Sequence, residues 1–148
     1  MGNKYVVTFS NYTPSTTEAP TLVSAANRRL RVLAVTVGGQ GTTSVPQAMV
    51  MSRSATGTTA TNAVTPTPHP HAECPAATFT ANRTWGTAPA GATNGVLLPF
   101  NALGGAFRWV STQYVPPMEV RNAEVIVFKL GAGITAQACS LEVLVEED

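Results

Sequence analysis

The chain contains few charged residues, and neither sign of charge dominates. Only 11% of its 148 residues are Asp, Glu, Lys or Arg, whereas an ordinary soluble domain contains about 25%. Nine Lys and Arg against eight Asp and Glu leave a formal net charge of +1. Proteins that bind nucleic acid use basic side chains to replace counterions along the phosphate backbone. Because the sequence offers no such basic stripe, we expect no nucleic acid among its partners.

Long apolar runs and a supply of cysteine are also missing. A membrane-spanning helix needs about 18 or more consecutive apolar residues, and the longest candidate, residues 30–37, has only the length of a strand. We therefore expect no membrane partner. Cys74 and Cys139 are the two cysteines, too few for a disulfide framework. We expect the chain to be made in a reducing cytoplasm.

The side chains on which catalysis depends are scarce as well. Asp148 is the sole aspartate, and both histidines, His69 and His71, stand in one segment. A serine nucleophile therefore has no His–Asp support. No glycine-rich loop leads into a helix that could bind a nucleotide. The sequence predicts a protein without enzymatic activity and without a cofactor.

One segment combines residue types that bind metal ions. Residues two apart lie on the same side of an extended chain, so His69, His71 and Glu73 could converge on one ion. The spacing resembles the His-x-His and Glu arrangement of cupins, which are also β-barrels. Cupins place more residues before the Glu and add a third histidine, which this chain lacks. We take a solvated proline-rich loop as the better interpretation and a metal site as the weaker one.

Apolar residues alternate along the chain far more often than they recur at helical spacing. Alternation with Gly and Pro between the runs predicts about eight short antiparallel strands and no significant helix. The expected fold is all-β, a single sandwich or barrel domain over residues 1–148. Candidate strands cover residues 4–9, 22–26, 29–37, 48–53, 79–85, 96–100, 106–112, 119–121, 124–130 and 137–147.

Two of these strands carry finer expectations. In residues 29–37, both parities are apolar past Ala34, which predicts burial on both faces of the strand. In residues 137–147, Cys139 shares its parity with three apolar residues and is expected to be an inert core thiol. Leu144 interrupts the polar face of the same strand, so we expect it to lie against a neighbour.

Two segments have the composition of flexible chain. We expect residues 1–20 to form an N-terminal arm, because Thr, Pro and Asn dominate after a short apolar run. Residues 54–77 are rich in Thr and Pro and are predicted to form a long loop. An inert surface loop and a segment that contacts a neighbour are equally compatible with that composition.

The surface offers a few residues that favour protein contact. Arginine and tryptophan dominate the energetics of many interfaces, and Arg108 stands beside Trp109. Contact and solvated strand ends are equally compatible with the arginines. For Trp109 we favour core packing, because it shares its parity with Phe107. Our candidate interface residues are Tyr5, Tyr12, Arg28, Arg29, Arg31 and Arg108.

Several stretches taken together resemble small structural proteins of tailed-phage virions, in particular head decoration (cement) proteins of the jelly-roll type. The stretches are Arg28 to Val32 leading to Val37-Gly38-Gly39, Met51 to Arg53 followed by Ala55 to Thr58, Phe107 to Val110, Pro116-Pro117, and Glu142 to Glu146. The motifs are short and spread over most of the chain.

The resemblance implies a jelly-roll-like β-sandwich that assembles as a homotrimer and binds the outer surface of an icosahedral capsid. Its partner would be the major capsid protein, its location the virion, and its role to stabilise the shell by bridging capsid subunits. Two alternatives stay open. One is a carbohydrate-binding β-sandwich with Trp85, Tyr12 and Tyr114 as aromatic platforms, and the other is a cupin-type metal protein.

Overall fold

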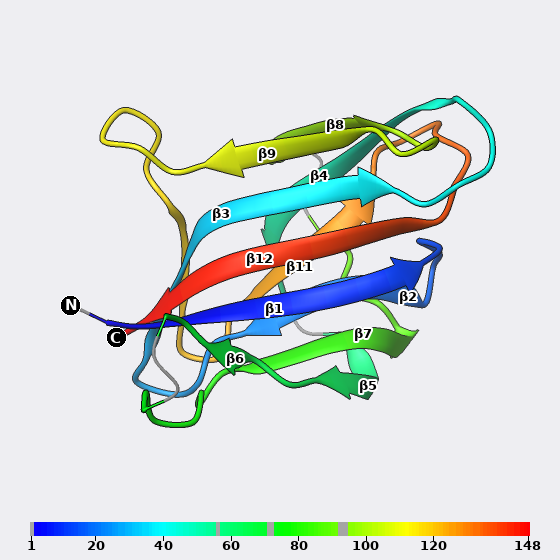
Figure 1. The fold of residues 1–148 in the computed structure, drawn as a ribbon. Coiled ribbons are helices and arrows are strands. Elements are labelled where there is room, and N and C mark those ends of the chain that lie inside the picture. The colour runs from blue at the N-terminus through cyan, green and yellow to red at the C-terminus, as the bar shows by residue number, and fades with distance from the viewer. Residues whose placement is uncertain (1, 56, 71–72, 92–94) are drawn as a thin grey trace.

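The computed structural model describes residues 2–55, 57–70, 73–91 and 95–148, and every regular element in these ranges is a β-strand (Figure 1). All strand pairs are antiparallel. This confirms the predicted all-β sandwich without helix, although with twelve strands rather than about eight. The strands are β1 (Asn3–Tyr12), β2 (Glu18–Val23), β3 (Arg29–Gly39), β4 (Pro46–Ser54), β5 (Thr58–Val64), β6 (Thr67–Pro68), β7 (Thr80–Thr87), β8 (Val96–Asn101), β9 (Ala106–Val110), β10 (Met118–Arg121), β11 (Val125–Leu130) and β12 (Cys139–Glu147).

The strands form two sheets that pack face to face. Sheet A has the order β10-β3-β12-β1-β6, and β9 also pairs with β3, on the same edge as β10 but farther along the strand. Sheet B has the order β5-β7-β2-β11-β4-β8. The first and last strands are neighbours in sheet A, so both chain ends lie at one end of the sandwich (Figure 1).

The core lies between the sheets and consists of the alternate residues that each strand turns inward. On β12 these are the four residues Cys139, Leu141, Val143 and Val145, all buried, as the alternation predicts. On β11 they include Ile126 and Phe128 of sheet B. Each apolar side chain of this size stabilises the folded state by about 1.5–3 kcal/mol when removed from water. Burial of one face of each strand therefore holds the two sheets together.

The expectation that β3 is buried on both faces is wrong, because a β-bulge changes the parity of the strand. Leu30 and Val32 point into the core before the bulge, and Val35 and Val37 do so after it. Opposite β3, Leu144 pairs with Ala34 and Val145 pairs with Val32, which leaves Leu33 without a partner on β12. A bulge inserts one extra residue into one strand of a pair. The run of apolar residues thus reflects a shift of face rather than burial on both.

The expected N-terminal arm is not an arm, since residues 3–12 form β1 inside sheet A. β1 pairs with β12 along most of its length and with β6 on its other side. Its alternate residues Tyr5, Val7 and Phe9 are buried in the core. The burial of these three side chains outweighs the flexibility that the Thr and Asn content of the segment indicated.

The predicted loop over residues 54–77 contains two strands, β5 and β6, at sheet edges. Every residue of β5 is exposed except the half-buried Val64, so no alternation marks this strand in the sequence. β6 is two residues long and contains Pro68. Proline is confined to edge strands because it cannot donate to a ladder. Edge pairing accounts for both strands despite their composition.

Within the described part of the chain, no helix has the length and apolar character that a membrane-crossing helix needs.

We predict that removing one inward side chain destabilises the sandwich strongly. Leu22 of β2 is fully buried in the core, whereas Leu97 of β8 is 57% exposed. Leu22→Ala should lower the free energy of unfolding by about 2–5 kcal/mol, through lost transfer energy and a residual cavity. The matched variant Leu97→Ala should change it by less than about 0.5 kcal/mol. Urea unfolding followed by fluorescence measures both, and equal effects would contradict the assigned core.

Candidate interaction surface

Two of the candidate interface residues, Tyr5 and Tyr12, belong to the core. The Tyr5 hydroxyl donates a hydrogen bond of 2.8 Å to the carbonyl oxygen of Pro75, and its ring meets that of Phe79 edge-on at 5.6 Å. The Tyr12 hydroxyl lies 3.7 Å from the sulfur of Met49. Burial raises the pKa of Tyr12 well above its usual value, and the neighbouring Cys139 adds to this rise. The prediction that Tyr5 and Tyr12 are interface residues is therefore wrong, and both are core residues of β1.

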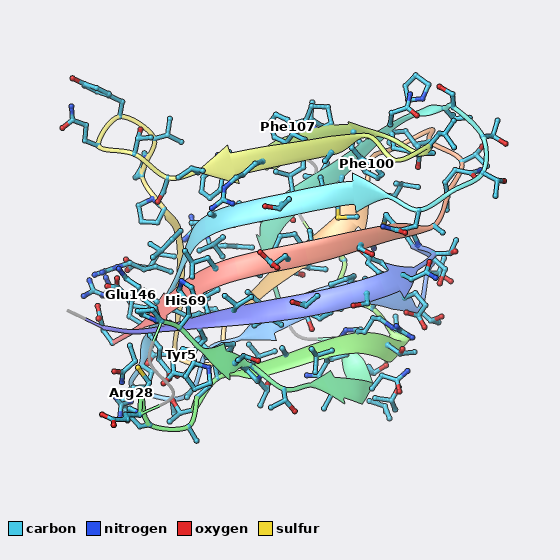
Figure 2. The ribbon with its side chains drawn as sticks, viewed as in Figure 1. Tyr5, Arg28, His69, Phe100, Phe107 and Glu146 are labelled. Atoms are coloured by element: carbon cyan, nitrogen blue, oxygen red, sulfur yellow. The ribbon has the colours of Figure 1, made fainter. Side chains whose placement is uncertain are left out.

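The arginines of β3 lie in a network of ion pairs at the end of the sandwich where both termini lie. Arg31 contacts three carboxylates, with 3.2 Å from Nε to Glu119, 3.0 Å from Nη1 to Glu146 and 3.1 Å from Nη2 to Asp148. Arg29 adds a 2.8 Å contact to Asp148. Figure 2 shows Arg28 and Glu146 at this same end. The network connects β3, β10 and β12, so Arg29 and Arg31 are engaged within the chain.

Arg28 is exposed, whereas Arg29 and Arg31 are half-buried. It lines a surface hollow of about 380 Å³ together with Asn27, Arg29, Arg121, Asn122 and Asp148. Arg29 and Arg121 have carboxylate partners, Asp148 and Glu119, which neutralise much of their charge. The hollow therefore has polar walls but little net positive charge.

The carboxylates of the network are held in their charged form. Burial alone would raise the pKa of Glu119, but hydrogen bonds from Arg121 and Arg31 outweigh it and hold that pKa below its usual value. The hydrogen bond from Arg29 lowers the pKa of Asp148, against a smaller opposing effect of burial. Both groups therefore favour the folded chain when ionised.

The structure describes two of the three metal candidates, His69 and Glu73. His71 lies outside the described residues. His69 is exposed, and its backbone N–H donates to the carbonyl oxygen of Lys4 at 2.8 Å, while Glu73 is exposed. Among the described residues, no three side chains of His, Cys, Asp or Glu are grouped so that they could hold a metal ion.

Arg108 lies on the outer face of sheet A, away from the other arginines. Cross-strand pairing places Thr8, Glu142, Thr36 and Arg108 in one row across β1, β12, β3 and β9. The next row across the same strands is Val6, Leu144, Ala34 and Val110. We name these the polar row and the apolar row. Leu144 stands between Val6 and Ala34 in the apolar row and is half-buried.

Large exposed apolar side chains gather in one segment of the described chain. They are Leu97, Leu103, Val110, Tyr114 and Val115, all between residues 97 and 115. This segment comprises β8, the turn to β9, β9 itself and the following residues 111–117, which we name the edge loop. Figure 1 shows β8 and β9 along one edge of the sandwich, with the edge loop projecting beyond it. The segment was predicted as strands, but its role as the apolar surface was missed.

On the outer face of sheet B, the residues that follow β7 lie over a small apolar cluster. Trp85 is only 5% exposed and packs with Ala19, Ala88 and Val127 in a small cluster on that face. The segment after β7 crosses the face, where the Gly91 N–H donates to Ser54 Oγ at 3.0 Å and Lys129 donates to the carbonyl of Ala90 at 3.4 Å. Trp85 and Tyr12 are therefore not available as sugar platforms, which leaves Tyr114, 85% exposed, of the three proposed.

Comparison of the chain with protein-family models, with curated proteins and with solved structures finds no match. The candidate site is consequently defined by geometry: an apolar edge and an outer sheet face with one row of unlike charges.

We predict that the chain loses stability as the pH falls, in part through the ion-pair network. A carboxylate whose pKa is lowered in the folded state stabilises it above the unfolded pKa, and this contribution disappears as the pH falls through the folded pKa. Glu119→Gln should lower the free energy of unfolding at pH 7 by up to about 1 kcal/mol and flatten its decrease between pH 5 and pH 3. Glu73→Gln, at an exposed carboxylate, is the control. Urea unfolding at stepped pH measures the profile, and parallel profiles would contradict the role of Glu119.

We also predict unequal reactivity of the two free thiols. Burial raises the pKa of Cys139 to about 11, whereas Cys74 is partly exposed. Since the thiolate is the reactive form, iodoacetamide at pH 8 should modify Cys74 in the native protein and Cys139 only after unfolding. Peptide mass spectrometry reads out each site. Equal labelling of the native chain would show that β12 does not bury Cys139.

Proposed function

We propose that this chain is a non-enzymatic structural protein of a phage virion, which binds the outer surface of an icosahedral capsid and bridges its subunits. The observation that carries the proposal is the concentration of exposed large apolar side chains in residues 97–115. Several large apolar side chains left exposed in one segment, rather than scattered singly, are typical of protein interaction sites. The chain thus combines a closed core with one adhesive edge.

The placement of the motifs that resemble decoration proteins also supports the proposal. The stretches around Arg31, Trp109 and Leu144 lie on β3, β9 and β12, which are hydrogen-bonded neighbours in sheet A. Pro116 and Pro117 belong to the edge loop beside them. Three stretches that are far apart in the sequence are therefore adjacent in sheet A, whereas the Trp109 side chain packs on the core and Met51 to Arg53 lies on β4 of sheet B.

The mechanism we propose is mechanical. A packed genome pushes a capsid outward, and a rigid protein fixed to two neighbouring subunits resists their separation. Each contact has modest strength, but several contacts made through one rigid body raise the barrier to rupture together. The resemblance implies that the chain acts as a homotrimer, which would give three such contacts. The sandwich supplies the rigidity, because its strands share one continuous core.

The proposal is tested by binding to empty capsids of a tailed phage that carries this gene, prepared without the chain. The chain should co-sediment with these capsids to saturation and raise their rupture temperature by several degrees. Native mass spectrometry should give three times the 15.4 kDa chain mass.

A glycan array is the parallel measurement. Absence of capsid binding together with specific binding to a glycan would overturn the proposal in favour of a carbohydrate-binding module. A co-sedimentation control with the same capsids already saturated with the chain separates specific from non-specific adhesion.

A further inference from the structure

Two opposite charges on the outer face of sheet A have no ion-pair partner among the described residues. Arg108 on β9 and Glu142 on β12 are both exposed and stand in the polar row, with Thr36 of β3 between them. In the neighbouring network, by contrast, charged side chains form ion pairs, such as Arg31 and Glu146 at 3.0 Å. Arg108 and Glu142 are therefore free to pair with another molecule.

An apolar strip adjoins this pair of charges. Val6, Leu144 and Ala34 run across β1, β12 and β3, and the row ends at Val110 on β9, which is 48% exposed. The strip has charges on both sides, since the polar row flanks it in one direction and the ion-pair network flanks it in the other. An apolar centre with a charged rim is the usual composition of a protein interface.

The edge loop extends the apolar row beyond the sheet in a fixed conformation. The Ser111 N–H donates to the carbonyl oxygen of Leu33 at 2.8 Å, which attaches the loop to the edge of β3. The Thr112 side-chain oxygen accepts hydrogen bonds from the N–H groups of Tyr114 and Val115, at 3.2 and 3.1 Å. Tyr114 is held 85% exposed by this turn. A preformed aromatic contact costs little conformational entropy on binding.

The two outer faces of the sandwich therefore differ. On sheet B, the residues after β7 cover the apolar cluster around Trp85. On sheet A, Val6 and Leu144 are half-buried, Ala34 is 4% exposed and Val110 is 48% exposed, and Val6 and Leu144 occupy positions that strands with a solvated face usually give to polar residues.

We propose that a second copy of this chain covers the outer face of sheet A. Arg108 and the edge loop of one copy contact Glu142 and the apolar row of the next. Each chain carries both patches of this contact. One patch is the cation Arg108 beside the apolar side chains of the edge loop, and the other is the carboxylate Glu142 beside the apolar row. The two patches are therefore complementary in charge and in polarity.

This inference deepens the proposed homotrimer and rests on it. In a ring, each copy gives Arg108 to one neighbour and Glu142 to the other, so that no charge stays unpaired. Contacts between unlike patches of identical chains close into rings when the rotation allows.

The test is a charge swap read out by native mass spectrometry and by sedimentation over a concentration series. R108E and E142R each place like charges together and should raise the dissociation constant of the oligomer at least about tenfold. The double variant R108E/E142R restores opposite charges and should return most of the lost affinity. Tyr114→Ala should weaken association to a similar degree, whereas R53E, at an exposed arginine of sheet B, should leave it unchanged.

Thermal unfolding of each variant, under conditions where it is monomeric, controls for effects on the fold. A wild-type oligomer that is unaffected by R108E, E142R and Tyr114→Ala overturns this surface and leaves the capsid function standing. Weakening by the single variants without recovery in the double variant also overturns the Arg108–Glu142 contact. A wild-type chain that stays monomeric refutes the homotrimer, and capsid co-sedimentation then tests the remaining function independently.

Discussion

The pairing of β12 with β1 on one side and with β3 on the other is the constraint on which the rest of the molecule depends. These are three of the longest strands, and their inward residues provide much of the core. Their outward residues provide three of the four members of the apolar row and of the polar row, and β3 and β12 also contribute to the ion-pair network. The same hydrogen bonds therefore position the core and the candidate surface, because successive side chains of a strand point to opposite faces. A change in that pairing would therefore move core residues and outer-face residues together.

The fold was predictable where alternation was strong. Residues 137–147 show it clearly, and β12 has the predicted buried parity and begins two residues later than predicted, at Cys139. β5 was missed because its exposed Thr and Ala residues carry no alternation at all. Tyr5 and Tyr12 were misplaced because the composition of the first residues was given more weight than their parity. Alternation of apolar residues in the sequence thus predicts the strands that pack on the core, but it predicts exposed edge strands poorly.

The candidate site was predictable only in part, for a different reason. Arg31 was identified as a charged strand residue, but its partners Glu119 and Glu146 stand 88 and 115 positions away. Which side chains meet depends on strand order and register, and one amino-acid sequence by itself gives neither. The same holds for Arg108 and Glu142, which share a row only because β9 and β12 both flank β3. The type of a residue can therefore indicate that it makes a contact, but the residue that it contacts is determined by the strand order and register.

The extra residue at Leu33 has a wider consequence for how this surface can vary. Leu33 separates the part of β3 that pairs with β10 from the part that pairs with β9. The Leu33 carbonyl oxygen accepts the hydrogen bond from Ser111 that holds the start of the edge loop. This hydrogen bond uses backbone atoms, so many side chains are compatible with position 33. The number of residues in the strand is more constrained than the side chain at position 33. Loss of one residue would turn Val35 and Val37 to the other face, out of the core. Across divergent sequences, the spacing between Val32 and Val35 should vary less than the amino acid at Leu33 itself.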